Sequence, residues 1–417
     1  MRIEIPEVAL VLLVGPSGSG KSTFAAKHFA PTEVLSSDHC RSLVVDDETD
    51  QGASGDAFEV LHLLAQKRLQ NRRLTVIDAT NVESHARRAL LSIARERHAL
   101  VDAIVLDVPL AVCLARNEQR RERDVGPHVV LHHRALLDQS LRGLEKEGFR
   151  RAHILEGVEA VDRASVTRTK LSNDRRDDAG PFDIIGDVHG CADELRTLLG
   201  QLGYTGEGAH PEGRRAIFLG DLVDRGPKVV DALRIAMSMV KAGRALSLMG
   251  NHEAKLQRWL RGRAVKRTHG IGTSIEQLER EPVTFRDEVR EFFESLESHY
   301  RLDDGKLVVA HAGLAEELQG GSSGKVHQFC LYGETTGETD DLGLPVRLDW
   351  ALGYRGRAAV VYGHTPVSTA RWVNGTICLD TGCVFGGKLT ALRWPERELV
   401  CVDALAVHYA PLRPLAT

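Results

Sequence analysis

Residues 15–22, Gly-Pro-Ser-Gly-Ser-Gly-Lys-Ser, constrain the fold of this chain more than any other feature of its sequence. An apolar run at residues 8–14 precedes them, and a run compatible with a helix follows at residues 23–29. Glycines at this spacing let backbone N–H groups converge on phosphate oxygens, the lysine neutralises the β and γ phosphates, and the last serine offers its hydroxyl to Mg²⁺. The alternative is an ordinary Gly/Ser-rich surface turn. We expect a loop that binds ATP and Mg²⁺, formed by Gly15, Ser17, Gly18, Ser19, Gly20, Lys21, Ser22 and Thr23.

Further short β-branched runs, at residues 33–36, 74–77 and 103–107, alternate with charged amphipathic stretches. Such alternation is typical of a parallel sheet with helical crossovers. Residues 171–180 are polar and lack a hydrophobic period, so we place a linker there. The predicted fold class is α/β, with a P-loop parallel-sheet domain at residues 1–170 and a second α/β domain at residues 181–417.

Composition and charge describe an ordinary globular protein without a basic coat. Of the 417 residues, 42% are hydrophobic and 27% are charged, so each of two domains can bury a core. The formal net charge of −4 excludes a global basic excess, and a polyanionic substrate would need local basic patches. One basic segment, residues 258–267, contains a tryptophan. It is equally compatible with a surface that tracks a nucleic-acid strand and with an ordinary solvated face.

The cysteines and the apolar runs restrict the compartment. The seven cysteines are scattered, odd in number and without a CxxC pair, which is against both a disulfide framework and a structural zinc site. The apolar run at residues 8–14 is too short to span a bilayer and ends in the phosphate loop. We therefore expect a cytoplasmic protein with no membrane partner, whose oligomeric state the sequence leaves open.

Charged residues after the loop could complete a phosphotransfer site. Asp38 follows the second expected strand, at the edge where doubly wound sheets bind ligands, and could accept the proton of an attacking hydroxyl. Arg41 could hold a phosphate of the acceptor. Arg116 and Arg120 are spaced i, i+4, so a helix would direct both at the transferring phosphoryl group. A solvated charged helix has the same spacing, and this alternative stays open.

Histidine and aspartate dominate the expected strand ends of the second domain. They occur in five short blocks: GDVHG at 186–190, GDLVDRG at 220–226, GNHE at 250–253, HAG at 311–313 and GHT at 363–365. Two divalent ions about 3.5–4 Å apart need a bridging carboxylate, oxygen ligands and neutral imidazoles. Histidines satisfied in a core are the alternative, but each of these histidines lies within two residues of Gly, Asp or Asn at an expected strand end. We therefore expect a binuclear metal site with Asp221 as the bridge.

In this order the five blocks resemble the binuclear calcineurin-like phosphoesterases, which implies an α/β sandwich of two sheets. By this resemblance Asp187 and His189 complete one metal site. His252 would protonate the leaving oxygen, oriented by Asp224, and Arg225 would bind the phosphate. The metals implied are Mn²⁺, Ni²⁺ or similar ions. The second metal would be completed by Asn251, His311 and His364, with Asp380 orienting a site histidine.

One detail of the metal blocks limits the assignment of a substrate. The block at 363–365 reads Gly-His-Thr, whereas many phosphodiesterases of this superfamily carry a second histidine there. The pattern, extended by residues 379–390, resembles the phosphoprotein phosphatase and dinucleoside-tetraphosphatase branch. The phosphatase blocks alone therefore leave phosphoprotein and dinucleotide substrates open.

The first domain carries a resemblance of its own. Residues 36–51, Asp78-Ala-Thr-Asn81 and the Arg116/Arg120 pair resemble the kinase module of bacterial polynucleotide kinase-phosphatases of RNA repair. The resemblance implies an enzyme that phosphorylates 5′-hydroxyl ends with ATP, Asp38 being the general base. It implies a phosphatase that removes 2′,3′-cyclic, 2′- or 3′-phosphate ends, with RNA favoured over DNA.

The same resemblance implies partners for this protein, and the sequence leaves two alternative functions open. No KxDG ligase motif occurs, so the expected partners are polynucleotide ends, a separate RNA ligase and an RNA 3′-end methyltransferase. One alternative is a phosphoprotein or dinucleoside-tetraphosphate phosphatase with a regulatory P-loop NTPase domain. Another is a nucleotide-sensing scaffold, which the candidate base Asp38 disfavours because sensing requires no acceptor base.

Overall fold

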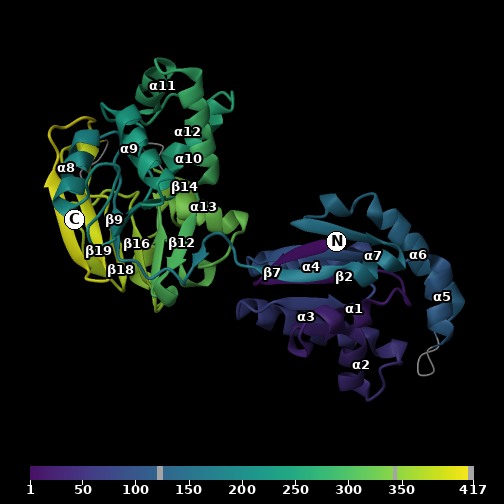
Figure 1. Ribbon diagram of the computed structural model, residues 1–417. Helices are drawn as coiled ribbons and strands as arrows, with labels where there is room; N and C mark the ends of the chain where they lie inside the picture. Colours follow the sequence, from purple (N-terminus) through teal and green to yellow (C-terminus); the bar gives the residue numbers. More distant parts are fainter. Residues whose placement is uncertain (120–124, 341–344, 412–417) are drawn as a thin grey trace. The chain divides into compact units, whose positions relative to one another are not determined.

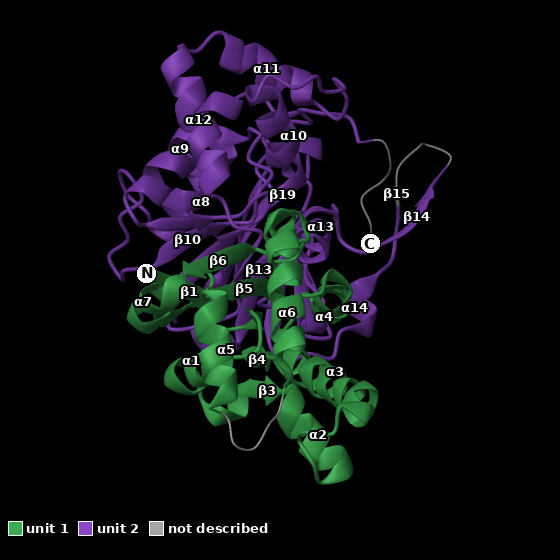
Figure 2. Cartoon of the chain, turned by 90° about the vertical axis from the view of Figure 1, so that its right-hand side faces the viewer, with its two compact units in different colours: residues 1–171, 321–323 green, residues 172–320, 324–417 purple. Residues whose placement is uncertain are grey.

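The computed structural model describes residues 1–119, 125–340 and 345–411 (Figure 1). The chain forms two compact units, coloured separately in Figure 2. Unit 1 comprises Met1–Leu171 with Gly321–Ser323, and unit 2 comprises Ser172–Gly320 with Gly324–Thr417. Within the described ranges, no helix has both the length and the apolar character needed to cross a membrane.

Unit 1 is built on a five-stranded parallel sheet with helices on both faces. In β2 (Ala9–Val14), alternate residues face opposite layers. Leu12 packs with α3 (Ser54–Gln70) and α4 (Ser84–Glu96), whereas Leu13 packs with α1 (Lys21–His28). Both layers bury β2 along its whole length, which explains its unbroken apolar sequence. The strands in spatial order are β3 (Val34–Ser36), β4 (Thr75–Asp78), β2 (Ala9–Val14), β5 (Leu100–Asp107) and β6 (Arg151–Glu156).

The remaining elements of unit 1 complete these two layers. Strands β1 (Arg2–Pro6) and β7 (Ser165–Thr169) form a separate parallel pair. The four strands expected from the sequence correspond to β2, β3, β4 and β5, and the predicted parallel sheet is confirmed. The helices are α1 (Lys21–His28), α2 (Ser37–Val45), α3 (Ser54–Gln70), α4 (Ser84–Glu96), α5 (Leu110–Glu118), α6 (Pro127–Leu141) and α7 (Gly157–Arg163).

Unit 2 is a sandwich of two sheets, as the resemblance implied. Ile184 and Ile217 of one sheet and Val309 and Val361 of the other belong to one buried cluster. The first sheet has the order β11 (Ala245–Ser247), β10 (Arg215–Phe218), β9 (Phe182–Ile185), β19 (Lys388–Trp394) and β20 (Glu398–Asp403). The second has the order β17 (Trp372–Val373), β18 (Thr376–Cys378), β16 (Ala359–Tyr362), β13 (Leu307–Ala310), β12 (His299–Leu302) and β8 (Asp174–Arg175).

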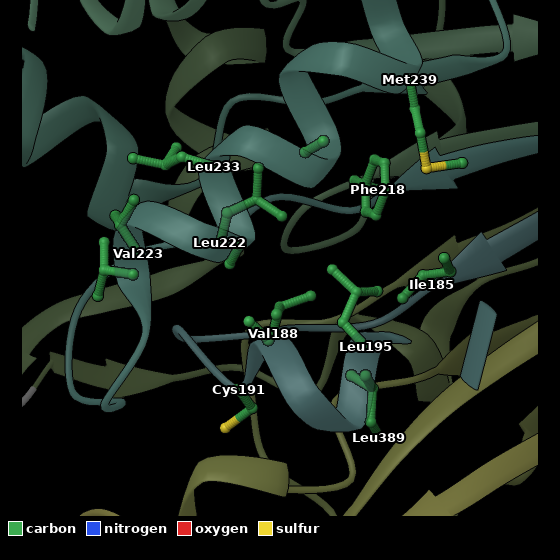
Figure 3. Packing of buried hydrophobic residues seen from close by; sticks show 14 of the residues in the cluster. Ile185, Val188, Cys191, Leu195, Phe218, Leu222, Val223, Leu233, Met239 and Leu389 are labelled. Atoms are coloured by element: carbon green, nitrogen blue, oxygen red, sulfur yellow. The ribbon is translucent and has the colours of Figure 1, made fainter. Parts of the chain in front are cut away.

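Helices cover the outer faces of the sandwich. Figure 3 shows Leu195, Phe218 and Leu233 gathered in the cluster that joins the first sheet to its helices. These helices are α8 (Ala192–Leu202), α9 (Val229–Lys241), α10 (Asn251–Leu260), α11 (Ile271–Glu279) and α12 (Val283–Ser295). The other elements are α13 (Gly324–Tyr332), which packs on the second sheet, α14 (Trp350–Gly353) and the hairpin of β14 (Thr335–Thr339) and β15 (Pro345–Arg347).

Residues 171–180 differ from the linker that the sequence predicts. Asp174 and Arg175 form β8, an edge strand that pairs in parallel with β12. The carbonyl of Asn173 accepts a hydrogen bond of 2.9 Å from the Arg301 N–H. Ladder bonds are made by the backbone, so a two-residue edge strand forms without the hydrophobic period on which sequence reasoning depends.

Candidate active sites

The predicted phosphate loop connects β2 to α1 in unit 1. Gly18 and Gly20 have φ of 82° and 94°, which glycine adopts without strain. A Cβ on Gly18 would lie 2.2 Å from the Cys113 carbonyl oxygen, so no larger residue fits there. The Lys21 ammonium donates to the carbonyls of Gly15 and Pro16 at 2.9 Å each. The loop thus combines a helix N-terminus with a lysine, the arrangement that binds nucleotide phosphates.

A cavity of about 340 Å³ opens beside this loop. Its lining includes Ser19, Thr23, Lys27 and Arg116. Arg116 lies on α5, and its Nη1 would be 3.4 Å from a Cβ placed on Gly20. The structure therefore brings Arg116 to the loop, where a guanidinium could meet a phosphoryl group. Arg120, the second predicted arginine, lies outside the described residues.

Asp38 stands at the start of α2, on the same sheet edge as the loop. The Ser36 hydroxyl caps the helix by accepting from the N–H groups of Asp38 and His39. In the sheet register, Ser36 of β3 pairs with Asp78 of β4, which is also the partner of Leu13 in β2. The carboxyl ends of these strands, and hence Asp38 and the loop, meet at one edge, as predicted.

Arg41 has partners within the protein itself. Its side chain is 3% exposed, Nη2 donates to the Asp38 carboxylate, and Nε donates to the Glu48 carbonyl at 2.8 Å. The Asp38 side chain is 29% exposed. A buried guanidinium thus positions a partly exposed carboxylate, so Arg41 supports the candidate base, and its contact with an acceptor phosphate stays a prediction.

The predicted metal ligands of unit 2 converge on Asp221. They lie in the loops that follow β9, β10, β11, β13 and β16. Asp221 Oδ2 lies 3.5 Å from His189 Nε2, and Asp221 Oδ1 lies 3.4 Å from His311 Nε2. His311 Nε2 in turn lies 3.0 Å from Asn251 Oδ1 and 3.0 Å from His364 Nδ1. One carboxylate therefore faces two groups of nitrogen and oxygen donors.

Hydrogen bonds on the far side of each ring orient the imidazoles. His189 Nδ1 donates to the Val223 carbonyl at 2.7 Å, and His311 Nδ1 donates to the Leu219 carbonyl at 3.0 Å. Each Nε2 therefore carries the lone pair and lies near Asp221, and His189 Nε2 also accepts a hydrogen bond from Arg225 Nη1. Within the described part of the chain, the buried atoms Asp187 Oδ1 and His364 Nε2 have no hydrogen-bond partner. Buried ligand atoms without a hydrogen-bond partner, together with a mixed set of carboxylates and imidazoles, fit a site for two divalent metal ions.

Burial explains the proton affinities of these groups. It raises the pKa of Asp187 and that of Asp221 well above their ordinary values, and neighbouring carboxylates add to the shift. It lowers the pKa of His189 well below its ordinary value and that of His311 to about 3. The imidazoles are consequently neutral, as metal ligands must be, and bound cations would reverse the carboxylate shifts.

A second group of side chains lies beside the candidate metal ligands. His252 Nδ1 lies 2.6 Å from Asp224 Oδ2, and its Nε2 accepts a hydrogen bond of 3.0 Å from Arg225 Nη2. The Arg225 guanidinium carbon lies 5.3 Å from the Phe385 ring centroid and 6.0 Å from that of Tyr409. The structure thus brings together the three residues to which the sequence assigned proton transfer and phosphate binding.

Two family models match the chain, an AAA domain over residues 10–144 and a calcineurin-like phosphoesterase over residues 180–386. A bis(5′-nucleosyl)-tetraphosphatase PrpE (asymmetrical) from Anoxybacillus flavithermus is 46% identical over 236 residues, which are 55% of this chain and 96% of the relative. The chain belongs to the calcineurin-like phosphoesterase family. It is a metallophosphoesterase with a P-loop domain.

Other relatives of this calcineurin-like phosphoesterase carry the same name, bis(5′-nucleosyl)-tetraphosphatase PrpE. The Bacillus velezensis protein is 47% identical over 230 residues, 54% of this chain and 92% of the relative. The Bacillus subtilis protein is 44% identical over 242 residues, 56% of this chain and 99% of the relative. These relatives match only the metallophosphatase part of the chain. The family models support one feature of the resemblance to polynucleotide kinase-phosphatases, namely a P-loop domain joined to a phosphoesterase domain.

Sequence reasoning missed three residues of the phosphoesterase site. Glu253 is fully buried and accepts the backbone N–H groups of Asp221 and Leu222 at 2.8 and 2.7 Å. Burial raises the pKa of Glu253 to about 7. The Ser274 hydroxyl donates to Asp224 Oδ1 at 2.5 Å. Glu253 follows His252 in the GNHE block and could have been found, whereas Ser274, on α11, adjoins no block.

Arg347, at the end of β15, is the third missed residue. Desolvation lowers the pKa of Arg347, and the attraction of Asp221 and Asp380 opposes this shift, so its charge acts on the metal centre. Its Nη1 donates to Thr365 Oγ1 at 2.8 Å. No block surrounds it in the sequence. The charge of Arg225 also acts on Arg347, so the two guanidinium groups are together candidates for binding an anion.

Asp380, to which the resemblance assigned the orientation of a site histidine, acts on Asp187 in this structure. Asp380 Oδ1 accepts a hydrogen bond of 3.1 Å from the Gly382 N–H. Burial raises the pKa of Asp187, and the negative charge of Asp380 raises it further. None of the hydrogen bonds of Asp380 within the described residues goes to a histidine. Asp380 follows β18, which pairs with β16. Gly363, which follows β16, packs against Asp187. The order of the two strands therefore places Asp380 near the Asp187 carboxylate.

Proposed function

We propose that unit 2 hydrolyses dinucleoside tetraphosphates with the help of two divalent metal ions. The observation that carries this proposal is the position of Asp221 between His189 and His311 in a chain 43–47% identical to bis(5′-nucleosyl)-tetraphosphatases. The identity extends over nearly the whole length of those relatives, which supports a common substrate class. Mn²⁺ and Ni²⁺ suit the mixed nitrogen and oxygen donors.

The protein's residues divide the work as follows. One metal would be held by Asp187, His189 and Asp221, and the other by Asp221 with Asn251, His311 and His364. When bound, two such ions polarise the phosphoryl group and make a water more acidic. Arg225 and Arg347 hold the remaining phosphate oxygens, because guanidinium groups match their charge and geometry.

His252 transfers a proton to the leaving phosphate oxygen. Burial and Arg225 lower the pKa of His252 well below its ordinary value, so the ring is neutral before substrate binds. Asp224 holds its Nδ1 at 2.6 Å and directs Nε2 toward the reacting group. An anionic phosphate beside the ring raises the pKa of His252, since negative charge favours the imidazolium form. The protonated ring is then a general acid.

The proposal is tested with diadenosine tetraphosphate and Mn²⁺. Asymmetric hydrolysis should release ATP and AMP, which anion-exchange chromatography separates, and a chelator should stop the reaction. A phosphopeptide and a 3′-phosphorylated oligonucleotide are compared at matched concentrations. If the kcat/KM for either exceeds that for the tetraphosphate, the substrate assignment is wrong.

A second candidate function is favoured by unit 1. Asp38 is a partly exposed carboxylate, fixed by Arg41 on the sheet edge that carries the phosphate loop. A nucleotide sensor needs no such base, whereas a kinase uses one to activate the acceptor hydroxyl. In this function unit 1 phosphorylates 5′-hydroxyl polynucleotide ends with ATP and Mg²⁺, and unit 2 removes cyclic, 2′- or 3′-phosphate ends. An RNA ligase and a 3′-end methyltransferase would then be the partners.

The two candidates are separated by one oligonucleotide that has a 5′-hydroxyl and a 3′-phosphate. End healing requires transfer of the γ-phosphate of ATP to its 5′ end and loss of its 3′-phosphate, both visible by gel electrophoresis. An enzyme that degrades diadenosine tetraphosphate and leaves both ends unchanged is a tetraphosphatase with a separate P-loop NTPase.

A further inference from the structure

Four side chains from three segments of unit 2 lie close together. Cys191 and Glu194 lie at the beginning of α8, Cys383 follows β18, and His408 lies after β20. The two sulfurs and a carboxylate oxygen of Glu194 lie within 4.8 Å of one another. His408 Nε2 lies 3.0 Å from Glu194 Oε1. We call these residues the thiol cluster.

The thiol cluster is largely buried and contains one carboxylate. Cys191, Glu194 and Cys383 are 0%, 3% and 1% exposed. The ion pairs of the described residues give Glu194 no lysine or arginine, and its one pairing is with His408. Its other hydrogen bond accepts the Leu405 N–H at 3.1 Å. Ordinary packing accounts for buried thiols. It does not by itself explain why a carboxylate oxygen and two sulfurs, all possible metal ligands, lie within 4.8 Å of one another.

We propose that Cys191, Glu194, Cys383 and His408 bind one Zn²⁺ ion, separate from the two ions of the Asp221 site. Zn²⁺ takes thiolate, imidazole and carboxylate ligands in a four-coordinate arrangement, and it is soft enough to prefer sulfur. The ligands are far apart in the sequence and include no CxxC pair. This is why the cysteine spacing alone argued against a structural zinc site.

The site would be structural. All of its positions are filled by side chains, which is typical of zinc sites that stabilise a fold. Cys191 is two residues from His189, and its Sγ lies 3.9 Å from the His189 carbonyl. Tyr409, the neighbour of His408, donates its N–H to the Val384 carbonyl at 3.0 Å and faces Arg225. Zn²⁺ would therefore connect one metal-bearing loop to the segment that packs against the phosphate arginine.

Cobalt substitution of the full chain tests this proposal. Thiolate ligands give Co²⁺ intense near-ultraviolet charge-transfer absorption, whereas the nitrogen and oxygen ligands of the Asp221 site do not. We expect about three equivalents of Co²⁺ per chain, with sulfur absorption for about one of them. Cys383→Ser should lose that absorption and about one equivalent. Cys330→Ser is the matched control, because Cys330 is buried in the same unit outside the thiol cluster.

Several results would overturn the proposal. One is a wild-type spectrum without sulfur absorption, and another is unchanged absorption in Cys383→Ser. A disulfide between Cys191 and Cys383, found by mass spectrometry in protein prepared without oxidant, would also overturn it. If Cys383→Ser does not fold, the wild-type spectrum still decides, and His408→Ala should keep the sulfur absorption with weaker Co²⁺ retention.

Discussion

Ser274→Ala tests whether Asp224 orients His252. Ser274 is fully buried, and its hydroxyl donates to Asp224 Oδ1 at 2.5 Å while accepting from the Asp224 N–H at 2.8 Å. Alanine removes both bonds without adding volume. The other carboxylate oxygen of Asp224 lies 2.6 Å from His252 Nδ1, so the substitution acts on His252 through a single intermediate residue.

The magnitude of this effect follows from the energy of the hydrogen bond that the substitution removes. A hydrogen bond to a charged group contributes about 1.5–3 kcal/mol, which corresponds to roughly 10- to 150-fold in rate if the bond is needed in the transition state. We expect kcat for phosphate hydrolysis to fall by that factor. KM should change little, because Ser274 is not among the groups that we expect to hold the phosphate.

The pH dependence adds a readout that a purely structural role would not change. Burial raises the pKa of Asp224 to about 7, and the bond from Ser274 opposes this shift. Removal of the bond disfavours the charged carboxylate, so its pKa rises further. The acidic limb of the kcat profile should move to higher pH, measured by steady-state hydrolysis of diadenosine tetraphosphate in Mn²⁺.

Ser247→Ala is the matched control. Ser247 is 2% exposed, and its hydroxyl has no hydrogen-bond partner within the described residues. The control should retain wild-type kcat and an unchanged pH profile. If Ser274→Ala also retains both, Asp224 does not need its serine, and the proposed chain from Ser274 to His252 is refuted.

Three other variants test the remaining assignments. Asp38→Ala should abolish ATP-dependent phosphorylation of a 5′-hydroxyl oligonucleotide and leave hydrolysis near wild type; loss of both activities in a folded variant would contradict the assignment of separate sites. Asp221→Asn should remove hydrolysis with every metal, measured by phosphate release, whereas retained activity would exclude a bridging role. Neutralising Arg263, Lys266 and Arg267 should flatten the salt dependence of single-strand binding by about 0.7 in log–log slope for each phosphate that the variant no longer binds. An unchanged slope would identify this segment as an ordinary solvated face.

The order of the elements and the metal ligands could be predicted because their signals are local. The phosphate loop lies between a fully apolar strand and a helix, and Gly18 is required by its backbone conformation. The candidate metal ligands lie within two residues of a glycine at strand ends, where loops from neighbouring strands converge. Both patterns are contained within a few consecutive residues, so a single sequence is enough to reveal them.

The supporting residues could not be predicted because their partners are distant in the chain. Ser274 is 50 residues from Asp224, and Arg347 lies on a hairpin of exposed residues. The thiol cluster has the same origin: α8, the loop after β18 and the segment after β20 meet only after the sandwich has folded. Sequence spacing reveals which residues lie close together within one helix or strand. It does not reveal tertiary contacts between segments that are distant in the chain.

Substrate choice depends on the segments around the metal centre, because the centre itself contacts only the phosphoryl group that both candidate substrates share. The basic segment at residues 258–267 leads directly to Gly270, whose carbonyl accepts the Arg225 N–H at 3.3 Å. A Cβ on Gly270 would lie 2.6 Å from Arg225 Cγ, so this segment continues into the support of the phosphate arginine. The cations of this segment contribute to binding only as far as substrate phosphates reach them. The two substrates differ in how many phosphates they bring, so the salt dependence of binding and the relative kcat/KM together decide between them.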